Sequence, residues 1–325
     1  MIIYFLHYFS TPIQQRAKAI AAYVLSSLIY FLQEENIIKK IIAMLLASAM
    51  LCVGFAGCGG KDSKDGKDGN PNVSATDVSA TDVIVKGTVD VSNVKLIKDG
   101  TLSVGMEIGY PPFEDKAENG DAIGYDVDLV YAIADKLGLE VNIVDTAFDV
   151  IFAGIGTNYD CVVSAVTITD ERRENCLFSD PYIDSYQAVV VKKGSDIKIT
   201  SLNDLSGKSV ALQDATTSKA LLEDMIKTGT VTDCKMGPSE KVLTAFTALD
   251  NGEYDVVLCD SPVADTYLTN YPDKYELAFL DHENVEQFGV AMAKTDEALQ
   301  TAINEAMDQL KNEGFFEENT AKWFA

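Results

Sequence analysis

The sequence predicts an α/β protein made of two similarly built lobes, each a mostly parallel sheet flanked by helices. Strand-like and helix-like patterns alternate from about residue 94 onward, and this alternation favours parallel strands covered by helices. The segments 157–167 and 252–262 share one form, an acidic turn, an apolar strand and a polar end. Such a repeated unit indicates two related lobes, and the chain length suffices for about two domains.

The individual elements follow from local patterns along the chain. The segment 126–138 places apolar residues on one helical face and ends at Gly138, a residue type that commonly terminates helices. Strands are expected at 101–108, 140–145, 159–167, 208–213 and 254–260, and helices at 126–138, 148–155, 216–229 and 240–252.

Residues 37–57 have the pattern of a secretory signal peptide. Lys39 and Lys40 precede an apolar run of 17 residues, and positive charge followed by apolar and then small residues is typical of such signals. The ending FAGC at 55–58 resembles a bacterial lipobox, in which the cysteine is lipidated and becomes the mature N-terminus. Cys58 is therefore the expected lipidation site, and a transmembrane anchor is the alternative interpretation.

The segments on either side of the signal peptide are not expected to contribute to the folded body. Residues 59–82 consist mainly of Gly, Ser, Asp and Lys with a short VSATD repeat. This composition cannot bury a core, so residues 58–93 are interpreted as a lipidated cysteine and a disordered tether. Residues 1–36 precede the signal lysines and are interpreted as an over-extended N-terminus rather than a second membrane helix.

Composition disfavours nucleic acid as a partner and most familiar hydrolase mechanisms. The net charge is −24, and an acidic surface repels phosphate backbones. Only two histidines occur, with no H-E-x-x-H, no G-x-S-x-G and no glycine-rich phosphate loop. We therefore predict no catalytic residue, no metal site and no cofactor. The redox state stays open for four cysteines without metal-binding spacing, Cys161, Cys176, Cys234 and Cys259.

Arginine is rare and unevenly placed. The chain has three arginines, Arg16, Arg172 and Arg173, and two of them are adjacent within SAVTITDERRE at 164–174. A guanidinium group binds carboxylates or phosphates through paired hydrogen bonds, which an ammonium group cannot do. The residues alone leave two interpretations open for Arg172, an anion-binding residue or a partner of surface acids.

The position of this segment favours a binding site. Ser164 and Thr167 lie at the carboxyl end of an expected strand, which is where α/β sheets bind ligands. Thr169 is suited to cap a short helix that begins with two acids. Arg172 would then lie in the first turn of that helix, where the dipole disfavours a cation and a bound anion would offset that cost.

Several motifs, in order, resemble the extracellular solute-binding proteins of polar amino-acid ABC transporters, a family with glutamine-, histidine- and arginine-binding members. The resemblance covers about residues 94–325. It implies a two-lobed periplasmic-binding-protein-like (type II) fold with a two-strand hinge near 188–193 and 282–288. The implied lobes are 94–189 plus 286–325, and 190–285. The motifs are GMEIGYPPFE, GYDVDLVYAIADKLGLEV, YDCVVSAVTITDERRENCLFSDPY and FEENTAKWF.

The resemblance also implies roles for individual residues. Arg172 matches the arginine that binds the α-carboxylate of the ligand, and Asp260 matches the acid that binds its α-ammonium. Glu107 matches an acid that often faces the ligand side chain. The remaining implied ligand-binding residues are the aromatics Tyr110 and Phe148, the strand-end residues Ser164, Ala165 and Thr167, and Gln213 and Thr217 in the second lobe. Ala215 stands where the family commonly has glycine.

Together these features predict a binding protein. We expect a monomeric, lipid-anchored extracytoplasmic protein that captures a free polar L-amino acid and delivers it to an ABC permease. A basic or amide ligand is favoured (arginine, lysine, histidine or glutamine), with cystine as the alternative. Two other classes stay open, a lyase similar to the cyclohexadienyl dehydratases on the same scaffold, and an amino-acid sensor.

Replacing Cys58 by serine tests the lipobox. Cys58→Ser removes the thiol that accepts the lipid, so the protein should be released into the medium or remain unprocessed. Membrane fractionation and the size of the mature chain report the outcome. If the variant partitions with membranes and is cleaved as before, the lipoprotein interpretation is wrong.

Overall fold

The computed structural model describes residues 87–324 of the chain. The expected over-extended start, the signal peptide, Cys58 and most of the tether lie outside these residues. Packing begins earlier than the expected residue 94, because the Val89 side chain is only 5% exposed and its backbone N–H donates to Lys136 O at 3.0 Å. Among residues 87–324, every helix is too short or too polar to span a membrane.

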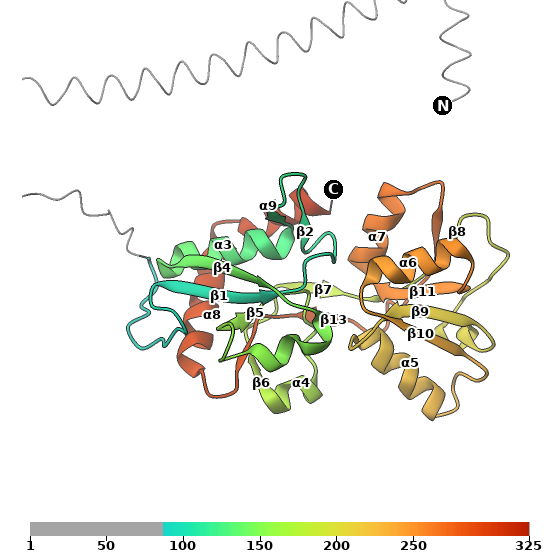
Figure 1. The fold of residues 1–325 in the computed structure, drawn as a ribbon, viewed down its shortest axis with the longest axis horizontal. Helices are drawn as coiled ribbons and strands as arrows, with labels where there is room; N and C mark the ends of the chain where they lie inside the picture. The colour runs from blue at the N-terminus through green and yellow to red at the C-terminus, as the bar shows by residue number, and fades with distance from the viewer. Residues whose placement is uncertain (1–86, 325) are drawn as a thin grey trace, which may run out of the picture. The chain divides into compact units, whose positions relative to one another are not determined.

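The first lobe contains a five-stranded sheet in the order β4-β1-β5-β14-β6. Strand β1 pairs in parallel with β4 and β5, whereas β14 pairs antiparallel with β5 and β6. Helices α3, α8 and α9 pack against one another beside it (Figure 1). The elements are β1 (Thr101–Met106), β2 (Asp115–Lys116), β3 (Ala122–Ile123), α3 (Tyr125–Leu137), β4 (Glu140–Asp145), the 3-10 helix η1 (Phe148–Gly154), β5 (Cys161–Val162), α4 (Asp170–Asn175), β6 (Cys176–Phe178), β14 (Ala291–Ala293), α8 (Glu297–Asn312) and α9 (Phe315–Trp323).

The second lobe repeats this plan with the order β10-β9-β11-β8-β12. Strand β9 pairs in parallel with β10 and β11, and β8 pairs antiparallel with β11 and β12. The two-lobed α/β fold is thus confirmed, and both sheets are mixed rather than mostly parallel. The elements are β8 (Gln187–Lys192), the 3-10 helix η2 (Leu202–Leu205), β9 (Ser209–Gln213), α5 (Thr217–Lys227), β10 (Lys235–Ser239), α6 (Val242–Asn251), β11 (Val256–Asp260), α7 (Ser261–Asn270) and β12 (Tyr275–Leu280).

Two short antiparallel strands connect the lobes. Strand β7 (Ile183–Ser185) pairs with β13 (Glu286–Phe288), and both lie between the two sheets in Figure 1. The first connection therefore precedes the expected hinge at 188–193, because these residues belong largely to β8 in the second sheet. The expected lobe boundary after residue 189 likewise falls inside β8.

The strand expected at 159–167 is shorter than its sequence pattern. Only Cys161 and Val162 form β5, and the backbone then turns, with Ala165 at φ 46°. A non-glycine residue in this left-handed region is uncommon and is often found in turns and functional sites. After the turn the backbone pairs with the β13 segment, where Thr167 forms an antiparallel bridge with Phe288.

A buried polar network holds this turn. The Asp126 side chain is fully buried, and its Oδ2 accepts hydrogen bonds from Ala165 N–H at 2.7 Å and from Tyr182 O–H at 3.0 Å. Burial raises the pKa of Asp126 to about 7. Burial also raises the pKa of Glu114, and the nearby charge of Asp126 raises it further. These two carboxyl groups therefore favour their protonated forms in the first lobe.

Asp126 makes stability depend on pH. Its pKa is about 7 in the folded chain and about 3.9 in an unfolded one, so the folded state binds more protons in between. Stability should fall as pH rises from about 4 to about 7 and then level off, with a slope from this residue of at most about 1.4 kcal/mol per pH unit. Asp126→Asn should flatten that part of the profile.

Urea unfolding at several pH values between 4 and 8 measures this slope. The matched control is Asp135→Asn, since Asp135 is exposed on the same helix α3. A profile for Asp126→Asn that runs parallel to that of the unchanged protein would show that Asp126 titrates at an ordinary carboxyl pKa.

Candidate functional site

All ten residues predicted to bind a ligand line one cavity between the lobes. Its volume is about 10 Å³, which is room for roughly one water molecule. Two further residues that line it, Glu114 and Thr216, were not anticipated. The lining is Glu107, Tyr110, Glu114, Phe148, Ser164, Ala165, Thr167, Arg172, Gln213, Thr216, Thr217 and Asp260.

Arg172 is the cationic group of the cavity. Thr169 caps helix α4 by accepting from Arg172 N–H at 3.1 Å, as expected. The guanidinium Cζ lies 5.6 Å from the ring centre of Phe148 and 5.2 Å from that of Phe152. Its Nη1 donates to Thr167 O at 2.8 Å and its Nη2 donates to Ala215 O at 3.3 Å. Arg172 therefore touches both lobes while its guanidinium lies over aromatic faces.

Its neighbour Arg173 has a different environment. Arg173 is exposed, its Cζ lies 6.0 Å from the ring centre of Phe178, and it does not line the cavity. The adjacent arginines thus point to different surroundings, which makes Arg173 a suitable control for Arg172.

Asp260 is the acidic group from the second lobe. It ends strand β11 and is 6% exposed. Its Oδ2 accepts from Tyr110 O–H at 2.5 Å across the cleft, and its Oδ1 accepts from Gln187 Nε2 at 3.2 Å. Burial and the nearby Glu286 raise the pKa of Asp260 to about 7, while the hydrogen bond from Tyr110 and the charge of Arg172 act in the opposite direction. A cation arriving beside Asp260 would favour its ionised form.

Glu107 forms a second acidic end of the cavity. Its Oε1 accepts from Phe148 N–H at 3.3 Å, and its Oε2 accepts from Gln213 Nε2 of the second lobe at 2.5 Å. Burial raises the pKa of Glu107, and its hydrogen bond with Gln213 lowers it in part. Two buried oxygens at this end, Gln213 Oε1 and Glu114 Oε2, have no hydrogen-bond partner among the described residues. The Glu107 carboxyl and Gln213 Oε1 are acceptors, whereas the protonated form that Glu114 favours would donate from Oε2.

The Ser164 hydroxyl has a supporting position. Its Oγ accepts from Glu107 N–H at 3.0 Å and donates its proton to Glu114 Oε1 at 2.7 Å. A serine hydroxyl has a single proton, so Ser164 has no donor left for another molecule. Ser164 lines the cavity and holds the backbone of Glu107 and the carboxyl of Glu114.

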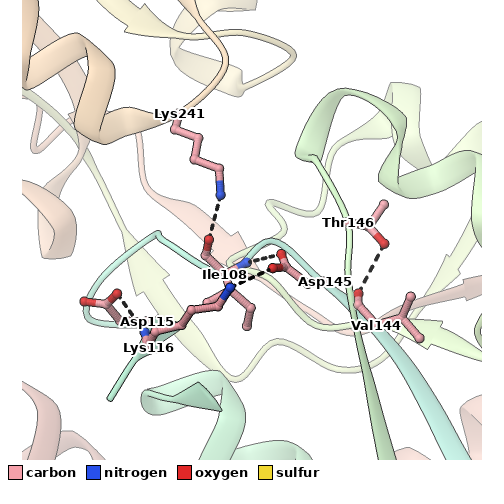
Figure 2. Close-up of polar contacts among 7 residues, drawn as sticks. All are labelled: Ile108, Asp115, Lys116, Val144, Asp145, Thr146 and Lys241. Carbon is pink, nitrogen blue, oxygen red and sulfur yellow. Dashed lines mark hydrogen bonds and ion pairs between the residues drawn. The ribbon is translucent and has the colours of Figure 1, made fainter. Parts of the chain in front are cut away.

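Lys241 of the second lobe contacts the loop that follows Glu107. It precedes helix α6, and its Nζ donates to Ile108 O of the first lobe at 2.7 Å (Figure 2). On the other side of this residue, Ile108 N–H donates to Asp145 Oδ1 at 3.2 Å, and Lys116 Nζ lies 3.3 Å from Asp145 Oδ2. The loop that begins with Glu107 is thus held from both lobes.

Ala215 occupies a backbone conformation that glycine adopts readily. Its φ is 59°, in the left-handed region that costs an alanine roughly 1–2 kcal/mol. Because Ala215 O accepts from Arg172, the turn positions a contact of the guanidinium group. Although Ala215 stands where the family commonly has glycine, the left-handed turn is present.

Gln187 and Glu286 are two neighbours of the cavity that the sequence did not reveal. Gln187 Nε2 donates to Asp260 and, at 2.9 Å, to Glu286 Oε1. Glu286 Oε2 accepts from the hydroxyls of Thr167 and Thr217. Neither residue stands in a recognisable motif. Gln187 begins β8 and Glu286 begins β13, so only the fold brings the two to the cavity. Glu114 could have been found, since it directly follows Phe113 in a motif that was assigned to the site.

The chemistry of the cavity is that of a binding site for a small molecule carrying both signs of charge. It contains a guanidinium group, several buried carboxyl groups and aromatic faces. Within residues 87–324, no group of three or more histidine, cysteine or acidic side chains is arranged to hold a metal ion.

Known proteins share this architecture and much of this sequence. A probable histidine-binding protein of Neisseria gonorrhoeae is 32% identical over 230 residues, 68% of this chain and 82% of the relative. The L-cystine-binding protein TcyJ of Escherichia coli strain K12 is 31% identical over 245 residues, 74% and 89% respectively.

Solved structures are similar over the same part of the chain. An ancestral arginine-binding protein bound to arginine has a TM-score of 0.65 and 37% identity, covering 70% of this chain and 99% of that one. An ancestral amino acid-binding protein described as a precursor of cyclohexadienyl dehydratase has a TM-score of 0.63 and 34% identity, covering 70% and 96%.

A family model matches residues 102–325, which contain all ten predicted site residues and, apart from Thr101, both five-stranded sheets. This chain therefore belongs to the bacterial extracellular solute-binding proteins, family 3.

Proposed function

We propose that the protein captures a free polar L-amino acid outside the cytoplasm and delivers it to the permease of an ABC transporter. The observation that carries this proposal is the pair of unlike charges at one cavity, Arg172 from the first lobe and Asp260 from the second. A zwitterion needs a cation for its carboxylate and an anion for its ammonium at a fixed separation. Similar proteins described as binding histidine, cystine and arginine support this assignment.

Binding requires the lobes to separate and close again. The cavity has room for roughly one water molecule, so an amino acid must enter a wider cleft. Two paired strands, β7 and β13, connect the lobes, and such short connections commonly act as hinges. We assign residues 87–186 and 286–324 to one moving body and residues 187–285 to the other, with β8 in the second.

The proposed location follows from the sequence before residue 87. A signal peptide at 37–57 and lipidation of Cys58 would tether a monomer to the outer face of the bacterial cell membrane. The extracellular solute-binding family supports the extracytoplasmic location.

Catalysis is the alternative function. It is favoured by the similarity to the ancestral precursor of a dehydratase. The proposal of binding alone predicts that a bound amino acid is recovered unchanged after prolonged incubation with the protein. Mass spectrometry of the released molecule distinguishes the two functions.

The acceptors at the Glu107 end favour a ligand whose side chain is a donor. Glu107 is almost fully buried, and the unpartnered acceptor Gln213 Oε1 lies near the same end of the cavity. A guanidinium, ammonium, imidazolium or amide group would satisfy such acceptors, whereas a carboxylate would be repelled. We therefore propose arginine, lysine, histidine or glutamine as the ligand, with cystine as the alternative.

A thermal-shift screen of the common amino acids and cystine tests this preference. A ligand at 100 times its Kd should add about 2.7 kcal/mol of stability, and the largest shifts should come from basic or amide amino acids. Glu107→Gln should reduce the shift for basic ligands more than for glutamine, because only the former lose a charge partner. A preference for aspartate or glutamate would contradict the proposed side-chain contact.

Substitution of Arg172 tests the head-group contact. Removing one partner of a buried charge pair costs about 2–5 kcal/mol, which corresponds to a roughly 30- to several-thousand-fold rise in Kd for Arg172→Ala. Arg172→Lys should recover only part of the affinity, because an ammonium group cannot make the paired in-plane contact. Titration calorimetry measures both.

Arg173→Ala is the matched control, since Arg173 is the adjacent residue and is exposed. It should change affinity by no more than the roughly 0–1 kcal/mol of a surface ion pair. Loss of binding in Arg173→Ala together with normal binding in Arg172→Ala would show that the carboxylate contact is assigned to the wrong residue.

A further inference from the structure

Glu286 lies where the two lobes and their connecting strands meet. It begins β13, one of the two paired strands between the sheets. Its carboxylate accepts three hydrogen bonds, from Thr167 Oγ1 at 2.9 Å, from Thr217 Oγ1 at 2.8 Å and from Gln187 Nε2 at 2.9 Å. Thr167 belongs to the first lobe and Thr217 to the second, so one carboxylate bridges both.

The head-group site, the part of the cavity around Arg172 and Asp260, also offers these two hydroxyls as donors to a carboxylate. Thr167 and Thr217 line the cavity with Arg172, and Thr217 is the first residue of helix α5, whose N-terminus favours negative charge. A threonine hydroxyl has one proton. Because both hydroxyl protons point to Glu286 Oε2, they cannot at the same time bind an incoming carboxylate.

The charge of Glu286 also acts on both ends of the head-group site. It favours the charged form of Arg172 and disfavours the charged form of Asp260, where it is the largest electrostatic influence after burial. The contact with Asp260 is indirect, since Gln187 Nε2 donates to both carboxyl groups. A second negative charge is therefore held beside the place of the proposed ligand carboxylate.

We propose that Glu286 is a built-in carboxylate that occupies the Thr167 and Thr217 hydroxyls and competes with the ligand α-carboxylate for them. This proposal rests on the proposed function, the binding of an amino-acid zwitterion. In the absence of ligand, the Glu286 carboxylate accepts from both hydroxyls. When the ligand binds, its α-carboxylate replaces Glu286 as their acceptor. The competition limits affinity specifically through the ligand carboxylate, which makes Glu286 an affinity-determining residue rather than a ligand contact.

The test compares acid and amide forms of the same ligands. L-Arginine, L-histidine and L-glutamine, each with its α-carboxamide, are titrated calorimetrically against the unchanged protein and Glu286→Gln. The amide keeps the side chain and ammonium but lacks the carboxylate. Comparing the ratio Kd(amide)/Kd(acid) between proteins at one pH cancels the ionisation of the probe itself.

Glu286→Gln should raise this ratio at least tenfold, about 1.4 kcal/mol, mainly by tightening the acid forms. Glu286→Asp, which keeps the charge on a shorter side chain, should give a smaller increase because its carboxylate cannot reach both hydroxyls. Glu283→Gln is the matched control, since Glu283 is exposed in the same segment and should leave the ratio unchanged.

Each outcome separates the proposal from the function on which it rests. An unchanged ratio in both Glu286 variants would overturn the competition. If acid and amide forms are then weakened equally, Glu286 binds the ammonium or only supports the fold. If the unchanged protein binds none of the six probes and binds neither L-lysine nor L-cystine, the proposed function itself fails, and the competition fails with it.

Discussion

The site depends on burying unlike charges between two lobes that each supply one of them. Arg172 comes from a short helix of the first lobe and Asp260 from the end of a strand in the second. Neither group forms a direct ion pair shorter than 4 Å in the described chain. Burial therefore acts on both of them, lowering the pKa of Arg172 and raising that of Asp260. A zwitterion placed between them would relieve both costs.

The surrounding network keeps these charges apart and in place. Tyr110 reaches across the cleft to Asp260, while the carbonyls of Thr167 and Ala215 hold the guanidinium group of Arg172. Behind the cavity, Asp126 fixes the turn at Ala165. Because each contact uses a buried polar group with a defined partner, the network restricts the geometry of the cleft more than an apolar lining would. The same network couples the site to pH through its carboxyl groups.

Much of this arrangement could be predicted from the sequence because the relevant signals are local. The apolar face of α3 and its end at Gly138 were visible in the pattern, and Gly138 adopts φ 69° as a helix terminator does. The cap at Thr169 and the neighbouring Arg172 also belong to one short motif. The other site residues were implied by the family resemblance of the motifs rather than by local patterns alone, and all ten predicted residues line the cavity.

The sequence by itself determined the α/β class, the two-lobed plan, the segments that carry the charges and the acidic character that disfavours nucleic acid. Only the tertiary structure decided how the crossing strands run and what they bring to the site. The position of β8 in the second sheet, the antiparallel pairs of β14 and the bridge from Glu286 to Thr167 and Thr217 all join residues far apart in the chain. Such contacts leave no local pattern, because they depend on how separate elements pack and on which hydroxyl proton each acceptor receives.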